Sequence, residues 1–283
     1  MTDDAPAPEL AVVVLSQGPR PTLPRAVASL TAQDVPVELV VVHSGPGEPT
    51  EVGLPRNVRV IRHPEPLFAG GARNVGVEAT TAPYVAFLAD DCEALPGWAG
   101  ERVAAHRAGA DAVASALVSH RPRRPIALGA HVALFVNRLP GADASSALRY
   151  GVSYTRELLE RVGPFRADLR SGEDSEFNAR AGGPAAIEWR PAVQTAHHGP
   201  ERLRPFLADQ TARGARMAAA WRDLHGDGPN PVAADALARI RPTIGRAWRT
   251  LPRADRVVVL AALPVIVLGG IAYARGARKG TRG

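Results

Sequence analysis

The sequence predicts an α/β protein with a doubly wound, mostly parallel β-sheet, helices on both faces, and a C-terminal helical and apolar tail. Short apolar runs alternate along the chain with segments of helical spacing, as in parallel strands joined by crossover helices. In addition, 46% of the 283 residues are hydrophobic, which is ample for a core. We expect one domain over residues 1–225 and a basic helical tail over residues 226–283.

The first half of the chain shows this alternation most clearly. Apolar runs bounded by turn residues predict buried strands at residues 10–15, 37–42, 58–61 and 84–88. Helical spacing predicts helices at residues 23–33 and 98–108, and a glycine-bearing loop from Ala69 runs into a helix that ends at Ala79.

The second half predicts further elements with less regular spacing. Strands are expected at residues 112–118, 151–154 and 187–193, and helices at residues 155–162, 170–180, 201–224 and 232–248. Residues 120–146 are rich in Arg and Pro and predict no clear element.

Two adjacent carboxylates, Asp90 and Asp91, directly follow the apolar run Tyr84–Leu88. In open α/β sheets, ligands bind beyond the carboxyl ends of the strands. Carboxylates at that edge suit a hard cation, which in turn binds phosphate oxygens. A solvated acidic turn would have the same composition, so this motif alone leaves both interpretations open.

Several other motifs follow in a fixed order along the chain. They are Ser29-Leu-Thr-Ala-Gln33, Glu38-Leu-Val-Val-Val42, Gly71-Ala-Arg-Asn-Val-Gly76, Phe87-Leu-Ala-Asp-Asp91, Gly163-Pro-Phe165, Gly172-Glu-Asp174, and Pro191 with His197 six residues later. Each motif is weak alone. In this order the set resembles the family 2 glycosyltransferases, nucleotide-sugar enzymes of the GT-A fold, over about residues 10 to 200.

The resemblance implies a divalent cation, Mn²⁺ or Mg²⁺, that stabilises the diphosphate leaving a nucleoside-diphosphate sugar. Asp91 matches the family's metal-binding aspartate, with Asp90 beside it on the nucleotide side. His197, or less readily His198, matches the histidine that completes the metal shell. A structural histidine pair after a strand would look the same in the sequence.

The resemblance also assigns the acid–base chemistry. Asp174 matches the general base that deprotonates the acceptor hydroxyl and inverts the anomeric centre, with Glu173 beside it. Ordinary acidic residues in a first helical turn would explain Glu173 equally well. Arg73 and Asn74 lie where they would position the diphosphate or the donor sugar, although a surface cation would also fit Arg73.

Three departures from the family pattern affect the nucleotide pocket. Ala89 replaces the usual first aspartate of the acidic signature, and His43 stands where the family usually has an aspartate that reads the nucleobase. The turn Ser16–Pro19 replaces the usual turn after the first strand. These changes leave the nucleobase open, and they support an alternative: a non-catalytic sugar-nucleotide-binding or scaffold protein.

The tail differs from the rest of the chain in charge. From Leu237 onward, the sequence has ten basic residues and one acidic residue, Asp255, which gives this stretch a charge of +9. Because the whole chain has a net charge of +6, the remainder carries −3. The 18 uncharged residues 257–274 suit a spanning or re-entrant membrane segment, or a buried terminal hairpin. We expect membrane association through the tail on the cytoplasmic side.

Other features limit the compartment and the partners. Cys92 is the only cysteine, and the acidic, proline-rich start does not resemble a secretory signal, so a reducing compartment is expected. The expected partners are a nucleotide-sugar donor and a glycan, lipid-linked or small-molecule acceptor. Nucleic acid is not expected, because no aromatic stacking platform accompanies the tail's charges.

Overall fold

The computed structural model describes residues 7–18, 21–47, 54–55, 58–226 and 230–280. Pro19, the last residue of the turn Ser16–Pro19, lies outside these residues. The chain divides into two compact units: Met1–Leu117 with Ala144–His197, and Val118–Asp143 with His198–Gly283. The domain limit expected at residue 225 stays a prediction, and the helix before it is grouped with the second unit.

One mixed eight-stranded sheet runs in the order β3-β2-β1-β4-β7-β6-β8-β5. The first four strands pair in parallel, whereas β4 with β7, β6 with β7, and β5 with β8 pair antiparallel. The strands are β1 (Leu10–Gln17), β2 (Val37–Ser44), β3 (Arg59–His63), β4 (Tyr84–Ala89), β5 (Cys92–Ala94), β6 (Ala112–Ser119), β7 (Ser153–Thr155) and β8 (Glu188–His197).

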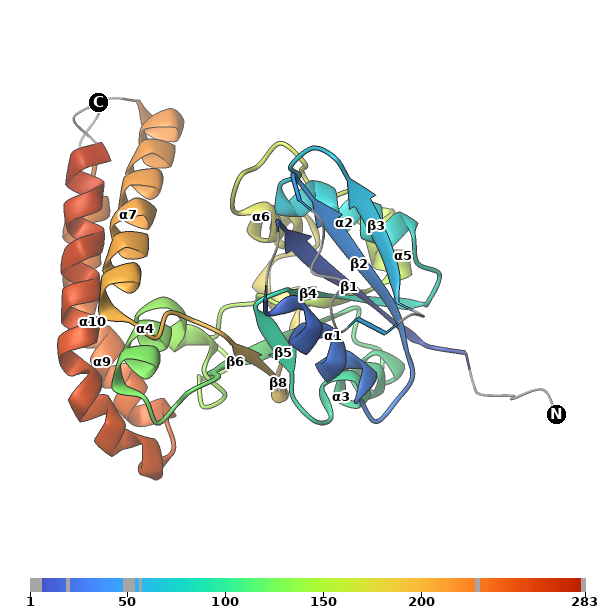
Figure 1. The fold of residues 1–283 in the computed structure, drawn as a ribbon, viewed down its shortest axis with the longest axis horizontal. Helices are drawn as coiled ribbons and strands as arrows, with labels where there is room; N and C mark the ends of the chain where they lie inside the picture. The colour runs from blue at the N-terminus through green and yellow to red at the C-terminus, as the bar shows by residue number, and fades with distance from the viewer. Residues whose placement is uncertain (1–6, 19–20, 48–53, 56–57, 227–229, 281–283) are drawn as a thin grey trace. The chain divides into compact units, whose positions relative to one another are not determined.

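Strand β1 is apolar at nearly every position because both faces of the sheet are covered. Its odd-numbered residues Ala11 and Val13 belong to a core with α2 (Ala69–Glu78), α5 (Arg156–Val162) and α6 (Glu173–Arg180). Its even-numbered residues belong to a second core with α1 (Leu23–Thr31) and α3 (Trp98–Arg107). These helices surround the sheet in Figure 1, so the predicted α/β fold with helices on both faces is confirmed.

The structure refines three sequence-based expectations for the first unit. The run Tyr84–Leu88 is parallel to β1 on one side but antiparallel to β7 on the other. Strand β5, which the sequence did not predict, begins directly after Asp91. Strand β8 continues past the expected end at Val193 and reaches His197, because β5 pairs with its last residues.

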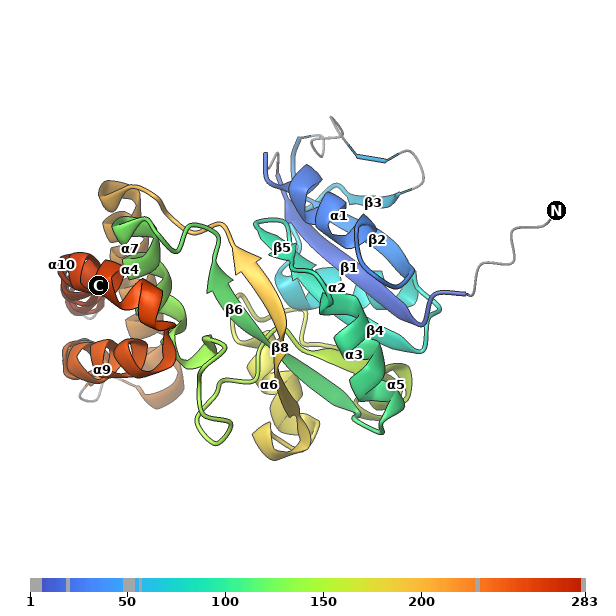
Figure 2. The ribbon, with the colours of Figure 1, turned by 90° about the horizontal axis from the view of Figure 1, so that it is seen from below.

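The second unit contains α4 (Pro125–Phe135), the 3-10 turn Val136–Arg138, α7 (Leu203–His225), α8 (Val232–Ala238), α9 (Ile240–Thr250) and α10 (Arg253–Gly280). Figures 1 and 2 show α10 lying alongside α7. The stretch 120–146, which predicted no element, contains α4, because Pro125 starts a helix of mostly apolar residues.

Two expectations for the tail need correction. The helix expected at residues 232–248 is two helices, α8 and α9, which meet at Arg239. The apolar segment 257–274 is not a hairpin: α10 continues through Pro264 and the Gly269–Gly270 pair. Neighbouring helices pack against this segment, and its apolar residues Val259, Val265 and Ile266 are buried.

Candidate functional site

The carboxyl end of β4 brings the adjacent carboxylates to the edge of the sheet at which the parallel strands end. The backbone N–H of Asp90 donates to the carbonyl of Leu15 in β1 (3.1 Å), which is the register partner of Ala89. Asp90 is buried, whereas the side chain of Asp91 is 40% exposed. Of the two carboxylates, Asp91 is therefore the one available to a ligand from solvent.

Strand pairing brings His197 to Asp91. In the antiparallel pair of β5 and β8, Cys92 lies opposite His197, so His197 comes next to the residue that precedes β5. Nε2 of His197 lies 3.8 Å from Oδ2 of Asp91. A carboxylate oxygen and an imidazole nitrogen form a ligand pair that suits Mn²⁺, so these two residues fit the expected cation.

Helices α2 and α6 are joined by a buried ion pair between Arg73 and Glu173. The Arg73 side chain is 14% exposed, and its guanidinium lies over the rings of Phe87 and Phe165, at 5.4 and 5.3 Å from their centroids. A buried charge needs such a partner, because an unpaired one is costly. Glu173 therefore holds the start of α6 against α2, and Arg73 is not a surface cation.

Asn74 joins α2 to the Gly163–Phe165 turn. Its Nδ2 donates to the carbonyl of Phe165, and its Oδ1 accepts from the N–H of Phe165, each at 2.9 Å. This pair of hydrogen bonds orients the turn that leads toward α6. A contact of Asn74 with a donor sugar stays a prediction.

Asp174 occupies the first turn of α6 and is half-buried. Gly172 begins the helix with φ +88°, a conformation that side-chain-bearing residues rarely adopt, so the chain turns sharply just before the two carboxylates. Burial raises the pKa of Tyr154 above its usual range, and the Tyr154 hydroxyl donates to Oδ1 of Asn178 in α6 (2.7 Å).

Topology brings Asp91 and Asp174 to the same edge of the sheet. Strand β3 is parallel to β1 and β4, so α2 begins at the edge where β4 ends. Arg73, in the second turn of α2, holds the start of α6 through Glu173. This edge therefore has a candidate metal pair and a candidate base, as the family resemblance implies.

His43 lies buried at the end of β2. Its Nδ1 lies 3.4 Å from the hydroxyl oxygen of Ser16, and its Nε2 lies 3.1 Å from the carbonyl oxygen of Gly47. The imidazole thus links the ends of β1 and β2. A role in reading a nucleobase stays a prediction.

His198, the weaker candidate for the metal shell, belongs to the second unit. Its ring lies against that of His120, with centroids 3.7 Å apart. The sequence did not indicate His120, because this residue lies at the start of the stretch that predicted no element. The Arg73–Glu173 pair was also missed, since nothing local in the sequence indicates a contact between such distant residues.

Comparisons with known proteins find similar glycosyltransferases. Residues 11–140 match the family model "Glycosyl transferase family 2". Two curated proteins named "Pre-mycofactocin glycosyltransferase", from Mycobacterium tuberculosis strains CDC 1551 and H37Rv, are 27% identical over 95% of this chain. The chain spans 58% of the length of these relatives.

Solved structures show the same fold. The mannosyltransferase PcManGT from Pyrobaculum calidifontis, in complex with GDP-Man and Mn²⁺, matches with a TM-score of 0.60 at 19% identity, over 97% of this chain and 87% of that one. S. aureus TarS 1–349 matches with a TM-score of 0.53 at 14% identity, over 96% of this chain and 91% of that one.

The motifs, the family model and the shared fold are three observations that point to the same kind of protein. The family model covers β4 and the turn with Asp90 and Asp91 that follows it, and the fold match extends over nearly the whole chain. Residues 11–140 thus resemble the family 2 glycosyltransferases, and the chain has the fold of solved glycosyltransferases.

Proposed function

We propose that the protein transfers a sugar from a nucleoside-diphosphate sugar to an acceptor hydroxyl with inversion at the anomeric carbon. The observation that carries the proposal is the approach of His197 to Asp91 at the sheet edge where α6 also begins. An oxygen and a nitrogen ligand side by side, at the edge of the sheet where an acidic helix start is also expected, match the needs of this chemistry.

A divalent cation, Mn²⁺ or Mg²⁺, fits the pair Asp91 and His197, and when bound it would offset the charge that develops on the leaving diphosphate. Asp174 takes the proton of the acceptor hydroxyl while the oxygen of that hydroxyl attacks the anomeric carbon. The bond from that carbon to the diphosphate oxygen breaks, and the bonding electrons leave with the nucleoside diphosphate. Arg73 and Glu173 keep α6, and with it Asp174, in position.

The first test is the thermal stabilisation of the purified protein by a panel of nucleotide sugars, with and without Mn²⁺. GDP-mannose belongs in the panel because the Pyrobaculum protein was solved with it. A ligand that binds only the native state raises its stability according to its affinity. We expect a Mn²⁺-dependent shift for one donor that is lost in Asp91→Ala and kept in Asp111→Asn, whose carboxylate pairs with Arg161.

Transfer itself needs an acceptor. Pre-mycofactocin belongs in the acceptor panel because the Mycobacterium tuberculosis relatives are named for it. Turnover that disappears in Asp174→Asn would support catalysis. Binding of a nucleotide sugar without any turnover would oppose it.

A second candidate function is a sugar-nucleotide-binding protein without efficient transfer. The engagement of the His43 ring with Ser16 and Gly47 favours it, because a ring held within the protein is a poor substitute for a carboxylate that reads a nucleobase. Turnover abolished by Asp174→Asn would exclude this candidate.

We also propose that the protein works at the cytoplasmic side of the membrane. The apolar helix Arg253–Lys279 is long enough to cross a bilayer, and basic residues flank it. Recovery of all the protein in a detergent-free high-speed supernatant of the cells would oppose this location.

A further inference from the structure

The second unit exposes an apolar stripe along one side of α10. Exposed residues recur there at spacings of three and four, which places them on a single helix face. Val257 is 73% exposed, Leu260 55%, Leu268 39% and Ile271 48%. A soluble helix normally turns such residues inward, so this face points to an apolar partner.

The opposite side of α10 is fixed by close packing against α7. A Cβ on Gly276 would lie 1.9 Å from the carbonyl oxygen of Thr211, and one on Gly214 would lie 2.0 Å from that of Tyr273. The two backbones thus touch near the C-terminal end of α10. Only 33% of the most apolar 18-residue stretch of α10 is buried. The helix therefore has both a packed side and an exposed apolar stripe.

This packing opposes a spanning role for α10. A spanning helix would either leave α7 or take it into the hydrocarbon. Helix α7 carries exposed charges such as Arg204, Arg213 and Arg216, which are costly there. A helix with one apolar face and one face packed on its own protein suits the membrane surface instead.

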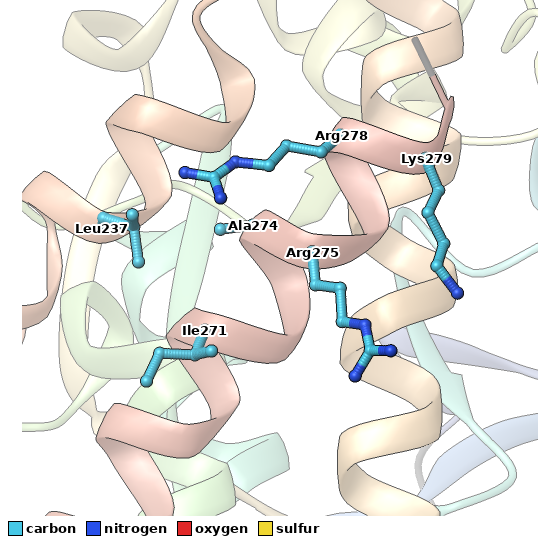
Figure 3. Close-up of a pocket in the computed structure, with 6 residues that line it drawn as sticks. All are labelled: Leu237, Ile271, Ala274, Arg275, Arg278 and Lys279. Carbon is cyan, nitrogen blue, oxygen red and sulfur yellow. The ribbon is translucent and has the colours of Figure 1, made fainter. Parts of the chain in front are cut away.

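A groove lies where the stripe meets the basic end of α10. Leu237 of α8 and Ile271 and Ala274 of α10 give it an apolar lining, and Arg275, Arg278 and Lys279 line it with charge. Its volume is about 460 Å³. Figure 3 shows Arg278 extending from α10 toward the side on which Leu237 lies. No acidic residue follows Asp255 in the sequence, so this end of the helix is strongly positive.

We propose that this groove binds an anionic phospholipid and that α10 lies along the membrane surface. The lipid phosphate contacts Arg275, Arg278 and Lys279, and the beginning of an acyl chain lies on Ile271 and Leu237. The exposed stripe from Val257 to Ile271 continues this apolar contact along about 20 Å of helix. The inference deepens the proposed membrane location and is independent of the transfer reaction.

Charge complementarity decides the occupant. An apolar peptide or a second copy of this chain would fill the stripe without using the three cations that line the groove at its end. A lipid with an anionic headgroup uses both, since juxtamembrane Arg and Lys are attracted to anionic leaflets.

The experiment is flotation of the full chain with vesicles of phosphatidylcholine alone or of equimolar phosphatidylcholine and phosphatidylglycerol. We expect binding to the anionic vesicles, and partition weakened by roughly 100-fold in the triple variant Arg275→Gln, Arg278→Gln, Lys279→Gln. The matched control, Arg123→Gln, Arg202→Gln, Arg204→Gln, removes the same charge from other exposed positions of this unit and is expected to bind as the wild type does.

A second variant tests the apolar part. Leu268→Ser with Ile271→Ser removes two exposed apolar side chains, so the fold should persist while vesicle binding falls. Circular dichroism verifies folding of each variant. Millimolar inorganic phosphate should not release the bound protein, and carbonate at alkaline pH should extract it.

Each contrary result has a distinct meaning. Equal binding to both vesicle types, or full binding by the triple variant, would overturn the anionic-lipid groove while leaving membrane association intact. Binding to neither vesicle type would overturn both the anionic-lipid groove and the membrane association. Release of the bound protein by phosphate alone would identify a free-phosphate site. Resistance to carbonate extraction would identify a spanning helix. A concentration-dependent dimer that is abolished by Leu268→Ser would identify a self-association face. Each of these three would also overturn the proposal.

Discussion

Oδ2 of Asp91 lies 3.8 Å from Nε2 of His197, because the short strand β5 pairs with the end of β8. If the pair holds a cation, His197→Gln should weaken Mn²⁺ binding on the order of tenfold or more. Titration followed by the electron paramagnetic resonance signal of free Mn²⁺ measures this. His63→Gln, at the end of β3, is the matched control. Unchanged Mn²⁺ affinity in His197→Gln would rule out this ligand.

Asp174→Asn should lower kcat by about 10²–10⁴-fold with little change in KM for the donor, since a positioned base acts on the proton in the transition state. Glu176→Gln is the control, because that carboxylate lies on the same helical turn but pairs with Arg180. Steady-state kinetics with saturating acceptor measures both. Equal losses in the two variants would point to a general effect on α6 and not to a base.

The Arg73–Glu173 pair should be strongly coupled. Glu173→Gln leaves a buried guanidinium without its counter-charge, and we expect a loss of about 3–5 kcal/mol in the free energy of unfolding. The double variant with Arg73→Met should lose less than the sum of the single variants. Urea denaturation completes the cycle.

The exposed pair Arg107–Glu9 is the control, and its expected coupling is much weaker because solvent screens both charges. Additive effects at Arg73 and Glu173 would show that the pair does not hold α2 and α6 together.

His106 should make the protein less stable in acid. Burial lowers its pKa to about 4, and its ring contacts the carbonyl oxygen of Ala110 and the hydroxyl oxygen of Ser153. In the unfolded chain the imidazole titrates near 6.5, so that state binds more protons between these values. The stabilisation is present above about pH 6.5 and is lost as the pH falls toward 4, at a cost of roughly 3 kcal/mol.

Urea denaturation between pH 7 and pH 4 measures this loss in the wild type and in His106→Gln. The variant should start less stable and show the shallower slope. Parallel pH profiles would contradict a neutral, buried His106.

The contact between α7 and α10 should not accept a methyl group. Gly276→Ala is expected to cost about 1–3 kcal/mol, because the added carbon meets the carbonyl oxygen of Thr211. Gly245→Ala in α9, where a Cβ meets nothing within 4 Å, should instead stabilise by about 0.5–1 kcal/mol. Thermal unfolding compares the two. A neutral Gly276→Ala would mean that the helices are not in contact there.

The sequence predicted the first four strands, because continuous apolar runs such as Leu10–Leu15 need cover on both faces. Ordered motifs also indicated the resemblance to the family 2 glycosyltransferases and drew attention to Asp91, Asp174 and His197. Strand β5 escaped prediction because Cys92–Ala94 gains its strand character only by pairing with β8. Residues 120–146 were unreadable because α4 is apolar around most of its circumference and so has no amphipathic period.

Side-chain contacts between distant residues were beyond the sequence for a different reason. Asn74 contacts Phe165, and Arg73 contacts Glu173, 100 positions further along the chain. Nothing in the local composition distinguishes a residue that joins two helices from one that faces solvent. Only the tertiary fold decides between these possibilities.

The pairing of β5 with β8 also has a consequence for biosynthesis. Asp91 leaves the ribosome roughly a hundred residues before His197, and contacts of such long range form late. A nascent chain therefore cannot assemble this ligand pair until β8 has been made and has joined the sheet. Acquisition of a cation at Asp91 and His197 would report that the sheet of the first unit is complete.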